Sequence, residues 1–231
     1  PMPLGSYVKQ NIKEADKVVR YMSGYCDMRI GEEVFGDQMV YVDSAFFDLF
    51  KFELKYGTYA NLYDKGKVFI SDEIARKYYN TEDAVGKPLT QIVLGKDGVR
   101  RPKEFEVGGV FKKPKANSSW GFEVLTYFDN FWDVNLDKDL SETSWKRWTH
   151  VLFLQIKDPN KVALVEKQLQ QYVEPQNKAR DDFKITSYYL NTFDGMMKRN
   201  RMDPRVDNDY LRGGIPDEAV TVPAIMAALL L

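Results

Sequence analysis

The stretch that decides the fold is Val68–Leu89, VFISDEIARKYYNTEDAVGKPL. Its pattern predicts a short buried strand, a helix that begins after Ser71, and a turn at Gly86 into the next strand. Ser71 can cap the first N–H groups of the helix, acidic side chains follow in the first turn, and Arg76 and Lys77 lie in the last turn. These residues build a scaffold and carry no reactive group, which points away from an enzyme.

Aromatic side chains gather just before this stretch. Ser44 is expected to cap a short helix that ends near Leu49 and presents Phe46, Phe47 and Phe50 to the core. A box of rings that stacks on a ligand is the alternative, but core packing is the more common role of such a cluster.

The N-terminal part predicts a helix and a hairpin. Apolar residues recur with helical spacing over Asn11–Met22, and Gly24 suits the end of that helix. Tyr25–Val34 and Gln38–Val42 are expected to be paired strands, with the turn at Gly36.

A second hairpin follows the deciding stretch. Leu89–Leu94 and Lys103–Phe111 are expected to pair across a turn at Gly95–Gly98. The adjacent Gly108 and Gly109 indicate a bulge or the close approach of another backbone.

The remaining pattern predicts three strands, a helical turn and a helix. These are the strands Phe122–Phe128, Val151–Ile156 and Phe183–Tyr188, the turn Asn130–Val134, and an amphipathic helix from Val162 to near Pro175. The last strand–helix–strand resembles half of a split βαβ sandwich. The N-terminal helix and hairpin could supply the other half, with Tyr56–Lys146 as an insertion.

Composition excludes several classes of protein. The net charge is −1, from 33 basic and 34 acidic residues, whereas a nucleic-acid binder usually has a basic excess. The single cysteine, Cys26, cannot form an internal disulfide or a cysteine-based zinc site. We expect it to be a small buried side chain.

The sequence offers few candidates for chemistry. His150 is the only histidine, and nothing indicates that it meets Cys26 as a base meets a nucleophile. No phosphate-binding G-x-x-x-x-G-K-[ST] motif occurs. Acidic and amide residues alternate from Asp133 as in a calcium loop, but Lys138 and Ser144 occupy the positions that need glycine and a carboxylate. We therefore predict no catalytic, cofactor-binding or metal-ligating residues and no cofactor.

Other candidate features have plainer explanations. A second acidic cluster is interleaved with arginines, an Asn-Ser-Ser tripeptide fits a glycosylation acceptor, and the tryptophans could form a docking surface although burial is expected. These features are Asp203, Asp207 and Asp209; Asn117–Ser119; and Trp120, Trp132, Trp145 and Trp148.

The two ends of the chain differ from its middle. Residues 1–6 lack an apolar core and are expected to be an expression scar. Residues 191–216 are expected to form a surface loop. The apolar run from Ala219 is too short to span a bilayer, and we interpret residues 217–231 as the start of a truncated transmembrane helix, with a C-terminal core helix as the alternative.

Four motifs in order resemble a known family. They are V-D-x-x-F-F-x-x-F-x-F-x-L-x-x-G at Val42–Gly57, S-D-E-x-A-x-K-Y and then D-x-V-G-K-x-L within Ser71–Leu89, and F-x-V-x-G-V at Phe105–Val110, followed by Pro114, Asn117 and Ser118. Together they resemble the MacB-like periplasmic core domain of FtsX/MacB-type ABC transporter permeases of bacteria.

The resemblance implies an α+β fold. A porter-like split βαβ subdomain would comprise residues 7–55 and 147–190, and residues 56–146 would form an inserted, mixed α/β, Sabre-like subdomain. The domain would lie on the periplasmic side of the inner membrane and transmit motion without catalysis.

The resemblance also implies partners. They are a cytoplasmic ABC ATPase, reached through the full-length permease, a second permease copy, and a periplasmic adaptor or substrate, with no nucleic acid. The alternative function is a freestanding periplasmic binding or scaffold protein.

Overall fold

The computed structural model describes residues 1–95, 97–115, 118, 120–134 and 141–196. The chain forms two compact units, one of residues 1–113 with 122–190, and a second to which residues 114–121 and the chain from 191 belong. The second acidic cluster, residues 217–231 and most of the expected loop 191–216 lie outside the described residues.

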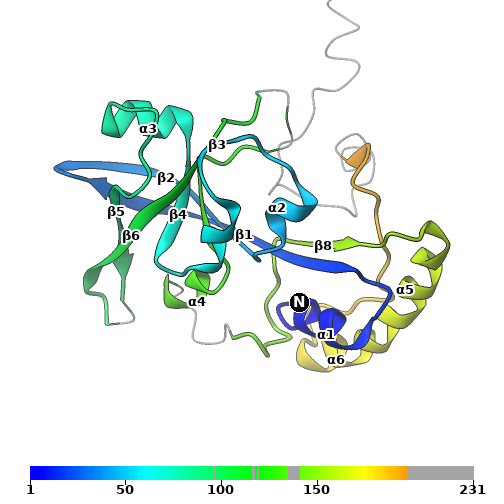
Figure 1. Ribbon diagram of the computed structural model, residues 1–231. Helices are drawn as coiled ribbons and strands as arrows, with labels where there is room; N and C mark the ends of the chain where they lie inside the picture. The colour runs from blue at the N-terminus through cyan, green and yellow to red at the C-terminus, as the bar shows by residue number, and fades with distance from the viewer. Residues whose placement is uncertain (96, 116–117, 119, 135–140, 197–231) are drawn as a thin grey trace, which may run out of the picture. The chain divides into compact units, whose positions relative to one another are not determined.

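The first unit contains all the helices and strands of the described chain (Figure 1). The helices are α1 (Leu4–Asn11), α2 (Phe46–Leu49), α3 (Asp72–Tyr79), α4 (Asn130–Val134), α5 (Val162–Leu169) and α6 (Val173–Ala179), and the 3-10 helices are η1 (Tyr59–Tyr63), η2 (Pro159–Lys161) and η3 (Gln170–Tyr172). The strands are β1 (Lys17–Ile30), β2 (Glu33–Val42), β3 (Leu54–Gly57), β4 (Lys67–Ser71), β5 (Pro88–Leu94), β6 (Arg100–Phe111), β7 (Val124–Tyr127) and β8 (Val151–Gln155). This mixture of a sheet with helices confirms the expected α+β class.

The strands form a closed ring with two additions. The order β2-β7-β4-β6-β5-β1 returns to its start because β1 also pairs with β2. The pairs β2–β7 and β4–β6 are parallel, and the other pairs of the ring are antiparallel. Outside the ring, β8 pairs with the first part of β1, and β3 pairs with the end of β6.

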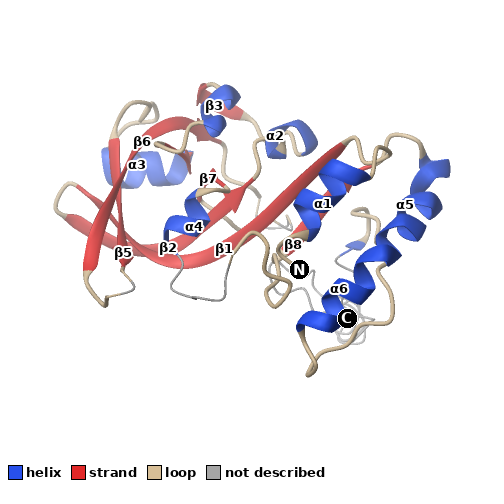
Figure 2. Ribbon diagram, turned by 90° about the horizontal axis from the view of Figure 1, so that it is seen from below, coloured by secondary structure: helices blue, strands red, loops and turns tan. Residues whose placement is uncertain are grey.

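Strand β1 connects the ring to the helices. Its first part, Lys17–Tyr21, pairs with β8, and its later part, Asp27–Arg29, pairs with β5. Figure 2 shows this long strand running from the side of α1, α5 and α6 into the ring. One continuous strand therefore connects the region of α1, α5 and α6 with the ring.

The deciding stretch folds as its pattern predicts. Ser71 follows the buried strand β4, and its Oγ accepts a hydrogen bond from Ile74 N at 3.1 Å. The acidic and basic residues of α3 lie in its first and last turns, as expected. Gly86 has a φ of +81°, which confirms the predicted turn.

The aromatic cluster is packed core. Phe46 and Phe47 of α2 are buried, and the rings of Phe52 and Phe122 lie 5.7 and 6.0 Å from that of Phe46. Phe50 meets Phe153 of β8 at 4.9 Å. The cluster packs against itself, as the core interpretation predicts.

The adjacent glycines of β6 mark an irregularity. The register between β4 and β6 shifts so that Val68 faces Val107 whereas Phe69 faces Gly109. A side chain on Gly109 would lie 2.5 Å from the Phe69 ring. The register shift confirms the predicted bulge, and the close neighbour of Gly109 is a side chain rather than the other backbone that the sequence also suggested.

The predicted helix over Asn11–Met22 is wrong. Helix α1 lies earlier, at Leu4–Asn11, and strand β1 begins at Lys17. Val18, Val19 and Tyr21 have strong strand propensity, and their partners in β8 and β2 are far away in sequence. The hairpin also turns earlier than predicted, at Gly31, whose φ is +57°.

Residues 1–6 also differ from expectation. Met2 and Leu4 are buried, and Met2 N donates to Arg147 O at 2.8 Å. These residues pack within the first unit, whereas the sequence predicts that they lie outside native structure.

The predicted strand at Phe183–Tyr188 is wrong. Both backbone groups of Ile185 are bound by the amide side chain of Asn177, at 2.8 Å each. Gln170 binds both backbone groups of Tyr188, at 2.6 and 3.1 Å. The side-chain amides of Asn177 and Gln170 thus bind the backbone groups of residues 185 and 188 in place of a neighbouring strand.

Helix α6 continues past Pro175, where the sequence predicted an end. The 3-10 helix η3 interrupts the helix before α6, so that the proline lies in the first turn of α6.

The strands do not separate at the expected subdomain boundaries. Strands β1 and β2 both lie within residues 7–55, yet β2 pairs with β7 and the later part of β1 pairs with β5, and both of these partners come from residues 56–146. Among the described residues, no helix has both the length and the apolar content needed to cross a membrane.

Candidate functional site

A small second core holds the helices together. We call it the helical junction, and its buried members come from α1, the residue after it, α5 and η3: Leu4, Val8, Ile12, Val165, Leu169 and Tyr172. Trp145 closes it, with ring centroids 5.7 Å from Tyr7 and 6.1 Å from Tyr172. The junction fixes α1 to the helices that follow β8.

The segment after α6 is fixed to the same helices. Leu190 N donates to the Glu166 carboxylate at 2.8 Å, and Gln170 holds Tyr188 as described above. The side chains of Tyr188 and Leu190 pack against the helical junction. Helix α1 and the end of the first unit are therefore fixed to the same helix, α5, and its continuation η3.

Arg20 lies on β1 where the strand leaves the helical junction for the ring. Its guanidinium binds Asp43 through Nη2 at 2.7 Å and through Nε at 2.9 Å, and Nη1 reaches Glu142 at 3.1 Å. It also lies 3.9 Å from the centre of the Phe128 ring. Burial lowers the pKa of Arg20, but the bonds to Asp43 outweigh it and raise the pKa overall. Arg20 is therefore a permanent cation that ties β1 to the chain after β2 and to the loop before β8.

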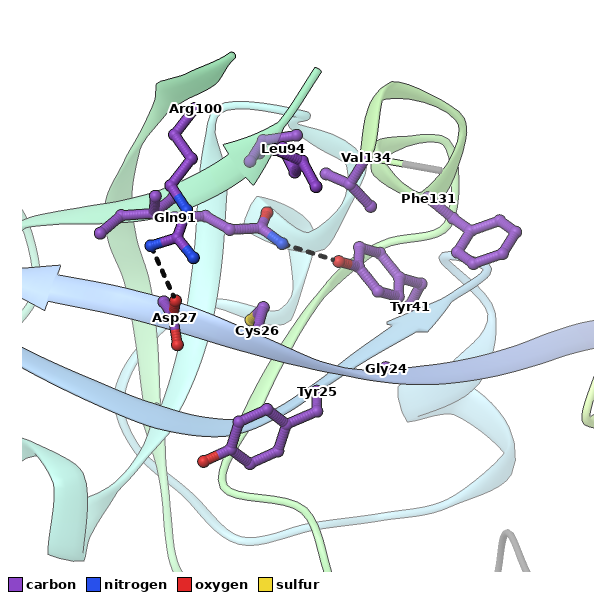
Figure 3. Close-up of a pocket in the computed structure, with 12 residues that line it drawn as sticks. Gly24, Tyr25, Cys26, Asp27, Tyr41, Gln91, Leu94, Arg100, Phe131 and Val134 are labelled. Carbon is purple, nitrogen blue, oxygen red and sulfur yellow. Dashed lines mark hydrogen bonds and ion pairs between the residues drawn. The ribbon is translucent and has the colours of Figure 1, made fainter. Parts of the chain in front are cut away.

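A cavity of ≈ 360 Å³ lies where β1 and β5 diverge, next to α4 (Figure 3). Gln91 spans its inner wall and donates from Nε2 to Tyr41 Oη at 3.0 Å. Cys26 lies beside them, and burial raises the pKa of its thiol to about 12. The thiol therefore stays protonated near neutral pH, which makes it a poor nucleophile.

His150 has partners of its own. Its Nδ1 accepts from Ser23 N at 3.1 Å, and its backbone N–H points at the Met22 sulfur. Burial lowers the pKa of the imidazole to about 4. Ser23 and Cys26 are three residues apart on an extended strand, about 10 Å. The structure therefore does not bring Cys26 and His150 together as a nucleophile and its base.

Asp133, the first position of the calcium-like pattern, is paired with lysines. Asp133 binds Lys103 and lies 3.6 Å from Lys65 Nζ; burial raises the pKa of this carboxyl, but the Lys103 hydrogen bond and charge lower it overall. In the parts of the chain that the structure describes, no group of three metal-ligating side chains occurs. Residues 135 and 137–139 of the calcium-like pattern lie outside those parts.

Each tryptophan has its own aromatic partners. Trp132 packs beside Phe128 and Phe131, Trp145 lies in the helical junction, Trp148 meets Phe183 edge-on, and Trp120 stacks on Phe193 in the second unit.

The sequence did not single out Arg20 or Gln91. A single arginine in the run VVRYM is a usable signal, because arginine is almost never buried without a partner. Gln91 gives no comparable signal, since glutamine is common on exposed strands.

The comparisons with known proteins decide the family. The model of the MacB-like periplasmic core domain matches residues 1–172 of the 231. The chain belongs to this family. No curated protein matches it.

Solved structures share the fold of this MacB-like periplasmic core domain. A domain of a putative permease from Porphyromonas gingivalis is 18% identical with a TM-score of 0.55, and 84% of each chain is covered. The extracellular domain of the ABC-type transporter YknZ from Gram-positive bacteria is 15% identical (TM-score 0.53; 80% of this chain and 87% of that one). The periplasmic region of MacB from Actinobacillus actinomycetemcomitans is 14% identical (TM-score 0.54; 86% and 81%).

The depressed pKa of His150 makes stability depend on pH. The imidazole has an unfolded pKa of about 6.5, so the folded state binds fewer protons than the unfolded state between pH 6.5 and about 4. We expect the free energy of unfolding to fall as the pH drops from 6.5 towards 4, and to be insensitive to this group above 6.5. Urea unfolding at pH 7.5 and pH 5.0 measures the fall.

The control for this prediction is His150→Asn. Its Oδ1 can keep the acceptor for Ser23 N, but asparagine does not titrate. The variant should lose less stability than the unaltered protein between the two pH values. An equal loss would assign the dependence to carboxylates instead.

Proposed function

We propose that this domain belongs to a bacterial ABC transporter permease and couples motion of the membrane segments to a periplasmic substrate or partner without catalysis. The domain would lie on the periplasmic side of the inner membrane. An ATPase on the cytoplasmic side would drive the motion through the full-length permease. A second permease copy and a periplasmic adaptor or substrate are the other expected partners.

The helical junction is the observation that carries this proposal. Helix α1 and residues 188–190 are anchored on the same helix, α5, with its continuation η3. Strand β1 leads from α1 into the ring and is paired along most of its length. A displacement of α1 therefore reaches the ring through a continuous strand held by backbone hydrogen bonds and by Arg20, rather than through a flexible linker.

Within the described residues, neither Cys26 nor His150 is activated, which supports a role without catalysis. The Cys26 thiol stays protonated, the imidazole of His150 stays neutral, and the two have separate partners. An enzyme of the nucleophile–base type needs these groups within hydrogen-bonding reach of each other.

The test severs the link between α1 and β1. A four-residue Gly-Ser insertion between Lys13 and Glu14, in the turn before β1, replaces a fixed connection by a flexible one. The assay uses the full-length permease reconstituted with its ATPase, with a spin label at Val34 in a Cys26→Ser background. Val34 is exposed at the hairpin of β1 and β2. Pulsed electron resonance then measures the label-to-label distance between the two permease copies with and without ATP.

We expect the unaltered permease to change this distance with ATP and the insertion variant to lose the change while it still hydrolyses ATP. The same insertion between Asp97 and Gly98, at the exposed turn of the β5–β6 hairpin, should leave the change intact. A full ATP-dependent change in the Lys13–Glu14 variant would refute the coupling role.

A further inference from the structure

The cavity between β1 and β5 has the features of a ligand site that the coupling role does not use. Strand β1 pairs with β8 up to Tyr21 and with β5 only from Asp27. Between these residues, β1 has a strand partner only on the side of β2. The cavity opens where β5 turns away from β1, at Val93 and Leu94.

The inner wall of the cavity carries an unused hydrogen-bond acceptor. Gln91 is 2% exposed, and its Nε2 is engaged by Tyr41. Its Oε1 is buried and has no hydrogen-bond partner among the described residues. Figure 3 shows the Gln91 side chain reaching across the cavity, between Tyr41 and the Arg100–Leu94 rim. An unsatisfied buried carbonyl oxygen is unfavourable until a donor fills the space beside it.

Gly24 of β1 lines the cavity and leaves space where a side chain would lie. This residue lies on the face of β1 that carries Met22, Cys26 and Met28, since side chains alternate along a strand. A Cβ added at Gly24 would meet no heavy atom within 4 Å. The neighbouring Tyr25 points its side chain away from the cavity (Figure 3).

The rest of the lining is mostly apolar, and one side of the cavity is open. Phe131 and Val134 of α4 and Leu94 of β5 supply the apolar wall. Arg100 Nη1 and Asp27 Oδ2 lie 3.8 Å apart at the open side and form a solvent-exposed ion pair. The volume is at the lower end of the range for small-molecule sites. An uncharged ligand with an apolar body would therefore fit this lining.

We propose that this cavity binds a small neutral molecule with an apolar ring or chain and one N–H or O–H group that donates to Gln91 Oε1. The proposal stands independently of the coupling role, because it rests on the cavity alone. The same chemistry occurs in a free small molecule and in the side chain of a bound peptide, and we assign the site to the free molecule because the volume is small.

Indole and indene are matched probes, because they share their shape and only indole has an N–H donor. The isolated domain, labelled with ¹⁵N, is titrated with each probe while the Gln91 side-chain amide signal is followed by NMR. We expect indole to bind about tenfold more tightly than indene, since a missing donor leaves Oε1 unsatisfied. The Gln91 amide signal should shift with indole.

Two variants and a control test the assignment. Gly24→Leu fills the cavity next to β1 and should abolish binding of both probes, whereas Arg29→Ser changes an exposed residue of the same strand that does not line the cavity and should leave binding unchanged. Gln91→Met keeps the length of the side chain and should remove the preference for indole. The thermal transition of each variant shows whether it is folded.

Some results would overturn the proposal. They are the absence of indole binding at millimolar concentration, equal affinity for indole and indene, or indole binding that Gly24→Leu does not reduce. Tighter binding of N-acetyltryptophanamide than of indole would assign the site to a peptide side chain and overturn the free-molecule assignment.

Discussion

Gly57→Ala is expected to lower the free energy of unfolding of the first unit by about 4 kcal/mol, from positive-φ strain and from overpacking together. Gly57 ends β3 with a φ of +86°, which alanine adopts only with strain. A Cβ there would lie 2.4 Å from Gly108 O and 2.7 Å from the Cα of Gly109. Both atoms belong to the backbone of β6, which also pairs with β4 and β5, so they cannot move aside alone.

Two other glycines separate the causes of this loss. Gly86 has a similar φ of +81° but open space around its Cβ, so Gly86→Ala should show the strain alone, about 1–2 kcal/mol. Gly24 has neither the positive φ nor a close neighbour, so Gly24→Ala should leave stability unchanged or raise it slightly. The measurement is the urea midpoint at constant slope. Equal losses at Gly57 and Gly86 would show that the contact with β6 has no effect.

Arg20→Met is expected to lower the free energy of unfolding by about 3–5 kcal/mol, the usual effect of removing one partner of a buried ion pair. Methionine keeps much of the apolar stem but leaves Asp43 without the guanidinium that binds both its oxygens. The contact with the Phe128 ring is lost as well. The loss should appear in the urea midpoint and should depend little on salt, since screening is weak for buried charges.

A double-mutant cycle isolates the ion pair from the packing. Adding Asp43→Asn to Arg20→Met should recover part of the loss, because the buried carboxylate no longer lacks a counter-charge. Arg101→Met is the matched surface control, since Arg101 pairs with Asp97 through two bonds in full contact with solvent, and it should change little. A double variant as unstable as the sum of both single variants would indicate that packing, and not the charge pair, causes the effect.

The helical junction gives Arg20 a further significance under the proposed coupling role. Arg20 holds β1 at the point where the strand leaves the junction, so a variant there loosens the connection between α1 and the ring. The Gly-Ser insertion after Lys13 breaks the same connection earlier in the chain. Both changes should reduce the ATP-dependent distance change, and the partner subunit should still hydrolyse ATP.

Local signals in the sequence were sufficient for several elements. The strand, cap and helix around Ser71, the turns at Gly86 and at Gly95–Gly98, and the irregularity at Gly108 were all predicted, and the structure confirms them. Each depends on chemistry within a few residues: a side-chain cap, a positive φ, or the lack of a Cβ. The order of the motifs was also sufficient to indicate the family, which the family match confirms.

Only the tertiary structure decided the elements whose partners are far away in sequence. Residues 17–22 have apolar spacing that suits a helix, but pairing with β8 and β2 makes them a strand. Residues 183–188 have the pattern of a strand, but Asn177 and Gln170 take their backbone groups instead. Contacts between segments tens of residues apart likewise decide three further features. They close the ring, surround Arg20 and leave Gln91 Oε1 without a donor among the described residues. The sequence determined how each short segment can fold, and tertiary contacts selected among the possibilities, because backbone hydrogen bonds and buried charges must be satisfied wherever a partner lies.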